Sequence, residues 1–346
     1  MLRKKLFKAA AAGLAAMVCL SGCAASQKKE GTYLVTMVTD TGGINDQSFN
    51  QSSWEGLESF NQKTGADVRY IESKQASDFT TNMDRACDAY SDLVWGIGFS
   101  LADSLINIAS YNPDIHFAIV DQSFEDTPMN VTGVTFRAEE SSFLAGYVAG
   151  MSTKTDRVGY IGAMKTFVND QFEYGFLAGV QFAAQERGVP IQVDEQFTES
   201  YSDVAKAKAI ANKMYSSGCD IIYHSVGGAG YGAIESAKEN KKYIIGVDSD
   251  QSYLAPDNVL TSALKNVNVA VEELSTKAMN GEDIGGKTFD FGLSDNGVGL
   301  PKENKNMDPE VYQKTMEVQE RIINGEIDPP STEETYKAWL SENGIQ

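Results

Sequence analysis

Short apolar runs alternate with amphipathic segments along most of this chain. The apolar runs are 33–39, 68–72, 93–99, 116–121, 131–136, 158–163, 191–197, 220–226, 243–248 and 259–264. Helical periodicity occupies the segments between and after them, at 51–64, 79–90, 141–151, 171–187, 203–217, 232–240, 268–280, 309–323 and 333–343. Nearly continuous apolar strands that alternate with helices predict parallel sheets covered on both faces. The strands are too many for one small sheet, so we expect an α/β protein with two doubly wound sheets.

Polar, glycine-rich segments follow many of the predicted strands. They are 40–43, 98–100, 121–122, 165–167, 227–230, 248–250 and 265–266. Ligands of open α/β sheets bind beyond the carboxyl ends of the strands, where these segments should lie. Their mixture of amides, carboxylates, glycines and aromatic rings predicts a pocket for a small polar ligand that has a flat apolar part.

The N-terminal segment has the pattern of a secretion signal. Four basic residues precede an apolar run at 9–20, which is too short to span a bilayer as a helix. The segment 20–23, Leu-Ser-Gly-Cys, resembles a lipobox, in which the cysteine is diacylated and becomes the mature N-terminus. We therefore expect a signal peptide at 1–22 and a tether at 23–31 that is anchored through Cys23. The protein would then lie on the extracytoplasmic face of the cell membrane.

Charge and cysteine content exclude several classes of partner. The formal net charge of the chain is −19, and removal of the four basic residues in 1–22 would bring it to −23. Such an acidic chain is not expected to bind nucleic acid or an anionic lipid surface directly. Cys87 and Cys219 lie far apart in the sequence without metal-ligand or redox spacing, so we interpret both as buried structural thiols.

Two glycine motifs resemble nucleotide-binding patterns, but only the second has the structural context that such a pattern requires. The segment 281–288 matches the phosphate-loop pattern letter for letter, but a predicted helix precedes it and a strand follows it. This order is the reverse of a phosphate loop, so we interpret the segment as a turn. The segment 228–233 follows a strand and opens a helix, and Asp248 ends the next strand. That arrangement is typical of a site for a ribose-containing ligand, although a tight turn beside an exposed Asp is the alternative.

Signals for catalysis are sparse. The chain holds two histidines, His116 and His224, and has no metalloprotease, serine-hydrolase or metal-ligand pattern. We expect His116 at the surface and His224 inside a sheet. We therefore predict a binding protein rather than an enzyme, with no cofactor and no metal site.

The segment 40–50, Asp-Thr-Gly-Gly-Ile-Asn-Asp-Gln-Ser-Phe-Asn, resembles the basic membrane protein family of lipoproteins. The best-understood members of that family are purine nucleoside receptors of ABC importers. Further segments resemble the family in the same order, at 139–146, 158–162, 175–180, 227–230, 246–248 and 262–265.

The resemblance implies a type I periplasmic-binding-protein fold, in which two Rossmann-like lobes are joined by a hinge and close on the ligand. The expected lobes are 32–132 with 250–280, and 133–249 with 281–346. It also implies capture of nucleosides, purine nucleosides above all, for an ABC permease and ATPase complex. Separately, we expect the protein to be a monomer.

The resemblance further implies a set of ligand-binding residues. Phe49 would stack on the base, Asp121 would bind purine nitrogens, and Asp248 with Lys265 would hold the ribose hydroxyls. Gly227 and Gly228 would form the loop beside the ligand, while Asp40 and Asn50 would lie near the base. This sequence departs from the family at Phe167, where many members have proline, and at Val226, where a facing aromatic residue is expected. Phe167 is therefore our candidate for the second stacking ring.

Other functions of the same fold remain open at this stage. A sugar or a ribose-derived signal would also use aromatic rings and carboxylates, often with an arginine, and Arg137 alone lies near a predicted strand end. A surface sensor or adhesin would bind its ligand only to regulate a membrane partner. A dehydrogenase is suggested by the glycine motif at 228–233, but it would require NAD and a catalytic base.

Overall fold

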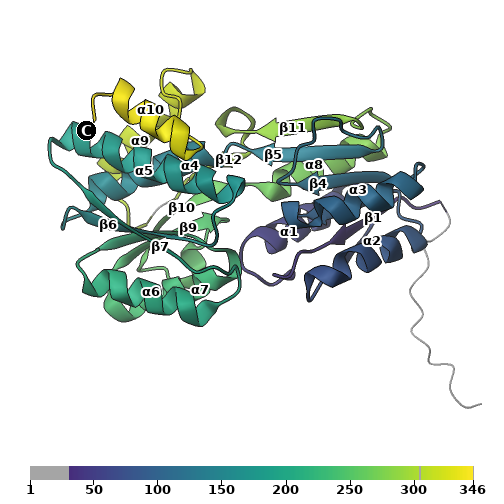
Figure 1. Cartoon of the computed structure of the whole chain (residues 1–346), viewed down its shortest axis with the longest axis horizontal. Helices are drawn as coiled ribbons and strands as arrows, with labels where there is room; N and C mark the ends of the chain where they lie inside the picture. The colour runs from purple at the N-terminus through teal and green to yellow at the C-terminus, as the bar shows by residue number, and fades with distance from the viewer. Residues whose placement is uncertain (1–30, 304, 346) are drawn as a thin grey trace, which may run out of the picture.

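Two six-stranded sheets, each flanked by helices, form two lobes that lie side by side in the computed structural model (Figure 1), which describes residues 31–303 and 305–345. In spatial order, the first sheet contains β11 (Lys287–Phe291), β5 (Val131–Phe136), β4 (His116–Val120), β3 (Leu93–Ile97), β1 (Leu34–Val38) and β2 (Asp67–Ile71). The second contains β12 (Val298–Gly299), β10 (Val259–Lys265), β9 (Tyr243–Asp248), β8 (Ile221–Ser225), β6 (Arg157–Gly162) and β7 (Gln192–Phe197). Every pairing is parallel except that of β10 with β12. The predicted pair of doubly wound sheets is confirmed.

Helices cover both faces of each sheet, which explains why the central strands are apolar throughout. In the first lobe they are α1 (Phe49–Thr64) with α8 (Val267–Met279), and α2 (Phe79–Asp88) with α3 (Ala102–Tyr111). In the second lobe they are α4 (Ala138–Ser152) with α5 (Phe167–Arg187), and α6 (Val204–Ser216) with α7 (Gly230–Asn240). The C-terminal α9 (Pro309–Ile323) and α10 (Glu333–Glu342) lie beside α4 and α5.

The chain passes between the lobes three times, after β5, after β10 and after β11. These crossings are joined by backbone hydrogen bonds from Arg137 to Phe291 at 2.9 Å and from Asn266 to Gly297 at 2.7 Å. The Arg137 guanidinium packs on Gly292, where a Cβ atom would lie 2.2 Å from Nη2. The three segments therefore form one connected hinge region.

Strand pairing differs from the expected lobe boundaries at three strands. We expected 133 onward and 281 onward in the second lobe, but β5 and β11 pair within the first sheet. We expected 250–280 in the first lobe, but β10 pairs with β9 of the second sheet. Hydrophobic periodicity identifies a strand without saying which distant strand will be its neighbour, which accounts for the difference.

Residues 1–30 lie outside the described residues, so the signal peptide, the lipidation of Cys23 and most of the tether remain predictions. Within the part of the chain that the structure describes, no helix has both the length and the apolar character needed to cross a membrane.

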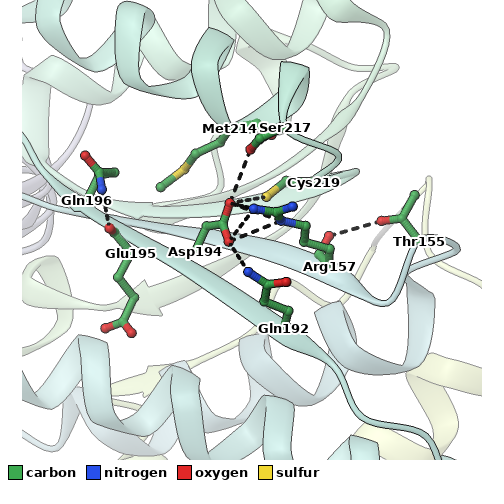
Figure 2. Close-up of polar contacts among 9 residues, drawn as sticks. All are labelled: Thr155, Arg157, Gln192, Asp194, Glu195, Gln196, Met214, Ser217 and Cys219. Carbon is green, nitrogen blue, oxygen red and sulfur yellow. Dashed lines mark hydrogen bonds and ion pairs between the residues drawn. The ribbon is translucent and has the colours of Figure 1, made fainter.

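Both cysteines of the described chain are buried, as predicted, and neither forms a disulfide. Figure 2 shows Cys219 beside Asp194 of β7, whose carboxylate also holds Arg157 at 2.7 Å and Ser217 at 3.2 Å. Burial, reinforced by the Asp194 charge, raises the pKa of the Cys219 thiol to about 12. Burial likewise raises the pKa of Cys87 to about 11, so neither thiol is a ready nucleophile.

Candidate functional site

An ion pair between the two lobes lies at the centre of the candidate site. Lys265 ends β10 in the second lobe, and its Nζ lies 2.5 Å from Oδ2 of Asp121, which directly follows β4 in the first lobe. The exposed fractions of the two side chains are 2% and 7%. Burial of both charges removes their hydration, so such a pair stabilises the protein only when its geometry is good and its other polar atoms find partners.

Aromatic rings from both lobes surround the Lys265 ammonium. Its Nζ lies 4.9 Å from the ring centroid of Phe49, 5.3 Å from that of Phe136 and 5.8 Å from that of Phe172. Phe49 is the first residue of α1, whereas Phe172 lies within α5 of the opposite lobe. The faces of these rings attract the cation, and they also give the site apolar walls.

Asp248 ends β9 and approaches the first lobe. Its Oδ2 accepts a hydrogen bond from the Ser48 hydroxyl, which belongs to the loop before α1. Burial raises the pKa of Asp248 to about 6, while the Lys265 charge and the Ser48 hydrogen bond oppose the rise. Asp248 and Asp121 both have left-handed backbone, with φ of +63° and +64°, which is uncommon for residues other than glycine. Strain of this kind is typical of functional sites.

Asp40, which follows β1, is held by a network of the first lobe. Its Oδ1 accepts hydrogen bonds from the Gly42 backbone and from Asn50 Nδ2, both at 2.8 Å. Asn50 Nδ2 also donates to Asp46 Oδ2 at 2.9 Å, so the two carboxylates fix the orientation of the amide. As a result, Asn50 Oδ1 is buried without a partner. Burial raises the pKa of Asp40 to about 6, although the bonds from Gly42 and Asn50 lower it.

The backbone directly after β3 comes close to both Asp40 and Phe49. Gly98 has φ of +103°, and a Cβ atom there would lie 3.5 Å from the Phe49 ring and 3.6 Å from Asp40 Oδ2. The carboxylate and the ring therefore line the same space.

Each of the three aspartates uses one carboxylate oxygen within the protein. Asp40 binds Gly42 and Asn50, Asp121 binds Lys265, and Asp248 binds Ser48. The other oxygen of each carboxylate has no hydrogen-bond partner among residues 31–303 and 305–345. The site thus contains three carboxylates and one ammonium, that of Lys265, so it offers more acceptors than donors. It favours a ligand that donates hydrogen bonds and has no negative charge.

The glycine loop of the second lobe contacts the first lobe at Asp46. A Cβ atom at Gly228 would lie 3.5 Å from the Cβ of Asp46, and Gly227 has left-handed backbone with φ of +52°. Ala229 donates its backbone N–H to the Tyr201 carbonyl at 2.8 Å, which fixes the loop. A cavity of about 310 Å³ opens here between the lobes. It is lined by Gly42, Asn45, Asp46 and Gln47 from the first lobe and by Tyr201, Ser202, Val204, Gly228 and Tyr231 from the second.

Most of the residues expected from the sequence meet between the lobes, but Phe167 differs from the others. Its side chain is 53% exposed and contacts Phe99, with 5.6 Å between ring centroids. Phe172, which is only 4% exposed, lies among the rings around Lys265 instead. Sequence reasoning missed Phe172 because it lies inside a helix, where an aromatic residue resembles a core residue.

The remaining motifs have structural roles. Segment 281–288 is a turn between α8 and β11, as predicted. His224 is buried within β8, where burial lowers its pKa to about 4, so it is a neutral sheet histidine rather than a base. His116 is half-buried and shares a hydrogen bond with Thr132 at 2.8 Å, so it is less exposed than expected. No cluster of metal-ligating side chains occurs within the described chain.

Two α/β lobes with three crossings and a polar, aromatic site between them define a solute-binding protein of the type I periplasmic class. The family described as ABC transporter substrate-binding protein PnrA-like matches residues 33–333. The chain therefore belongs to this family of ABC transporter substrate-binding proteins, and it is not an enzyme. This confirms the resemblance to the basic membrane proteins and excludes the dehydrogenase.

Several known proteins are similar to the chain over most of their length. The ABC transporter nucleoside-binding protein BmpA of Lactococcus lactis is 37% identical, over 95% of this chain and 100% of that protein. Basic membrane protein A of Borreliella burgdorferi is 36% identical, over 89% of this chain and 91% of that protein. A solute-binding protein structure from Aeropyrum pernix superimposes with a TM-score of 0.81 at 23% identity, over 90% of this chain and 97% of that chain.

Proposed function

We propose that this ABC transporter substrate-binding protein captures purine nucleosides. The observation that carries the proposal is a site in which Asp40, Asp121 and Asp248 each keep one carboxylate oxygen unengaged, with Lys265 paired to Asp121 and aromatic rings of both lobes beside its ammonium. A nucleoside matches this site because its ribose donates two neighbouring hydroxyls and its base is flat and apolar on both faces. The similarity to a nucleoside-binding protein of Lactococcus lactis supports the same ligand class.

The proposal assigns the two ends of the ligand to different residues. Asp248 accepts hydrogen bonds from the ribose hydroxyls, and Lys265 donates to the same diol. Phe49 and Phe172 contact the faces of the base. Hydrogen bonds to its polar edge come from Asp40, Asn50 and Asp121. Gly227 and Gly228 allow the second lobe to approach the ligand closely. Phe167 is half-exposed, so we place it at the rim, where it contacts Phe99 rather than the base.

The excess of carboxylates in the site has a consequence for ligand charge. Three aspartates outnumber the single Lys265, so a phosphate group would enter a field of like charge. We therefore expect nucleosides to bind and their 5′-monophosphates to fail.

A sugar ligand is the alternative from the same fold. Sugar sites often pair carboxylates with an arginine, and Arg137 is the candidate for that role. Its guanidinium is already engaged at the hinge region by Glu140 at 2.9 Å and by Asp290 and Asp295 at 3.5 Å. Arg137 is therefore not available to a ligand in this arrangement, which favours the nucleoside.

We further propose that the protein is a lipoprotein that is anchored through diacylated Cys23 at the extracytoplasmic face of the membrane. There, as a monomer, it would deliver nucleosides to an ABC permease and ATPase. A sensor role would use the same pocket and differ only in the membrane partner. Loss of nucleoside uptake in a cell that lacks the protein would support the importer role.

The test of the ligand class is mass spectrometry of the small molecule that purified protein releases on denaturation. It is joined by calorimetric titrations with guanosine, inosine, adenosine, their 5′-monophosphates, ribose and galactose. A released purine nucleoside and saturable binding of nucleosides alone are the expected results. Binding of a sugar without binding of any nucleoside would overturn the proposal.

A further inference from the structure

Gln47 of the first lobe is held by two side chains of the second lobe. Gln251 Nε2 donates a hydrogen bond to the Gln47 carbonyl at 3.0 Å. The Tyr253 hydroxyl donates to Gln47 Oε1. Gln251 and Tyr253 follow β9 and lie outside the set of residues assigned to the ligand. We call Gln47, Gln251 and Tyr253 the Gln47 latch.

Contacts within the second lobe fix the orientation of the Gln251 side chain. Its side chain is buried, and its Oε1 accepts the backbone N–H of Val247 at 3.2 Å, so the amide must present Nε2 to the other lobe. Its own backbone N–H donates to Ser262 Oγ at 3.1 Å. A Cβ atom at position 246 would lie 2.6 Å from Gln251 Oε1, so Gly246 leaves room for this amide.

The turn that the latch holds is strained and directly precedes two residues of the site. Gln47 has left-handed backbone with φ of +57°, which costs energy for a residue with a Cβ atom. The next residue, Ser48, donates to Asp248, and the one after it, Phe49, lies against Lys265. Contacts at Gln47 therefore determine where Phe49 and Ser48 lie.

We propose that Gln251 and Tyr253 are positioning residues for ligand capture, which hold the Gln47–Phe49 segment in its binding arrangement only when the lobes are closed. The proposal rests on the proposed function, because Phe49 is there a ligand contact. Both donors come from the second lobe, so separation of the lobes breaks both bonds and releases the strained turn. The latch therefore slows ligand release and leaves ligand entry unchanged.

The latch acts through neutral groups. Burial, together with the charges of Glu55, Asp46 and Asp250, raises the pKa of the Tyr253 phenol above its ordinary value. The hydroxyl thus remains a hydrogen-bond donor throughout the physiological pH range.

The decisive variants are Tyr253→Phe, Gln47→Asn and the double variant, with guanosine as the probe. Tyr253 is 55% exposed, so loss of its hydroxyl leaves the fold intact. Asparagine tolerates left-handed backbone, and its side chain is one methylene shorter and does not reach Tyr253. Tyr111→Phe, at an exposed tyrosine of α3, is the matched control.

Stopped-flow fluorescence would measure the association and dissociation rate constants separately. We expect each single variant to raise the dissociation rate constant about three- to tenfold, as loss of one hydrogen bond implies, with the association rate constant within about twofold of wild type. The double variant should release guanosine no faster than the single variants, because they remove the same contact. Unchanged dissociation, or losses that add in the double variant, would overturn the latch.

Small-angle X-ray scattering separates this inference from the proposed function. With guanosine bound, Tyr253→Phe and Gln47→Asn should have a larger radius of gyration than wild type and Tyr111→Phe. If wild-type protein binds no nucleoside, the proposed function fails. If wild-type protein binds guanosine but the guanosine-bound wild type and double variant have equal radii of gyration, the latch alone is refuted.

Discussion

Phe49 and Phe172 approach the same ammonium, that of Lys265, from opposite lobes, with their ring centroids 4.9 Å and 5.8 Å from Nζ. Neither lobe alone contains both rings. A flat ligand that contacts both rings therefore ties the lobes together, which links recognition of a base to closure.

Substitution of either ring should weaken nucleoside binding. We expect Phe49→Ala and Phe172→Ala each to cost about 1–3 kcal/mol of binding free energy, the usual contribution of one base–aromatic contact. Phe167→Ala is the control, since its half-exposed ring should change the binding free energy by less than about 0.5 kcal/mol. Calorimetric titration with guanosine measures all three. A large loss at Phe167 with none at Phe172 would restore the expectation drawn from the sequence.

Asp248 should accept hydrogen bonds from the ribose hydroxyls and so determine whether a ligand that lacks them can bind. We expect wild-type protein to bind guanosine much more tightly than 2′,3′-dideoxyguanosine, because the analogue leaves a buried carboxylate without donors, at a cost of at least about 1–3 kcal/mol. Asp248→Ala should weaken guanosine binding strongly and barely affect the analogue. A calorimetric cycle of two proteins and two ligands provides the measurement. Equal losses for both ligands would show that Asp248 does not contact the ribose.

The raised pKa values predict how stability depends on pH. Burial raises the pKa of Asp40 to about 6, above its unfolded value, so the folded protein binds more protons than the unfolded chain between about pH 4 and 6. The free energy of unfolding that Asp40 contributes must therefore fall as the pH rises through this window. The total change is at most about 3 kcal/mol, at 1.36 kcal/mol for each pKa unit.

Urea unfolding of ligand-free protein at pH 4.5, 5.5 and 7 tests this sign. Compared with wild type, Asp40→Asn should show a smaller decrease in unfolding free energy across these pH values, because the variant lacks the titrating group. Subtracting the pH profile of the variant from that of wild type removes the contributions of other buried carboxyl groups. One of these is Glu139, whose pKa is raised by burial to about 8. Parallel pH profiles would mean that Asp40 titrates normally.

Membrane attachment should depend on Cys23. We expect Cys23→Ala to lose its acyl chains and to leave the membrane fraction, while the intact mass of wild type reports a diacylated N-terminus at this residue. Cys87→Ala serves as a control for the loss of a cysteine elsewhere. Retention of the Cys23 variant in the membrane fraction would refute the anchor.

Local sequence patterns predict where the strands and helices of this fold lie more accurately than they predict which strands pair with one another. The strand–helix alternation predicts β1 to β10 close to their observed bounds, because burial on both faces leaves a continuous apolar run in the central strands. The assignments of β5, β10 and β11 to sheets differ from expectation, because pairing depends on strands distant in the sequence.

The rule for strand ends explains which site residues are predictable. Asp40, Asp121, Asp248 and Lys265 all lie at or just after the carboxyl ends of strands, so topology alone brings them to the cleft. Phe172 and Gln251 reach the cleft from a helix and from a loop. Their positions depend on how the lobes pack, and no local pattern carries that information.

The three crossings also determine when the first lobe can fold. Its sheet includes β11, and α8 covers one of its faces, yet both elements follow the entire sequence of β6 to β10. A growing chain therefore cannot complete this lobe until residues near 291 have been synthesised. The partly made polypeptide would remain without a finished core for most of its synthesis, a condition that suits passage through a translocation channel in the unfolded state.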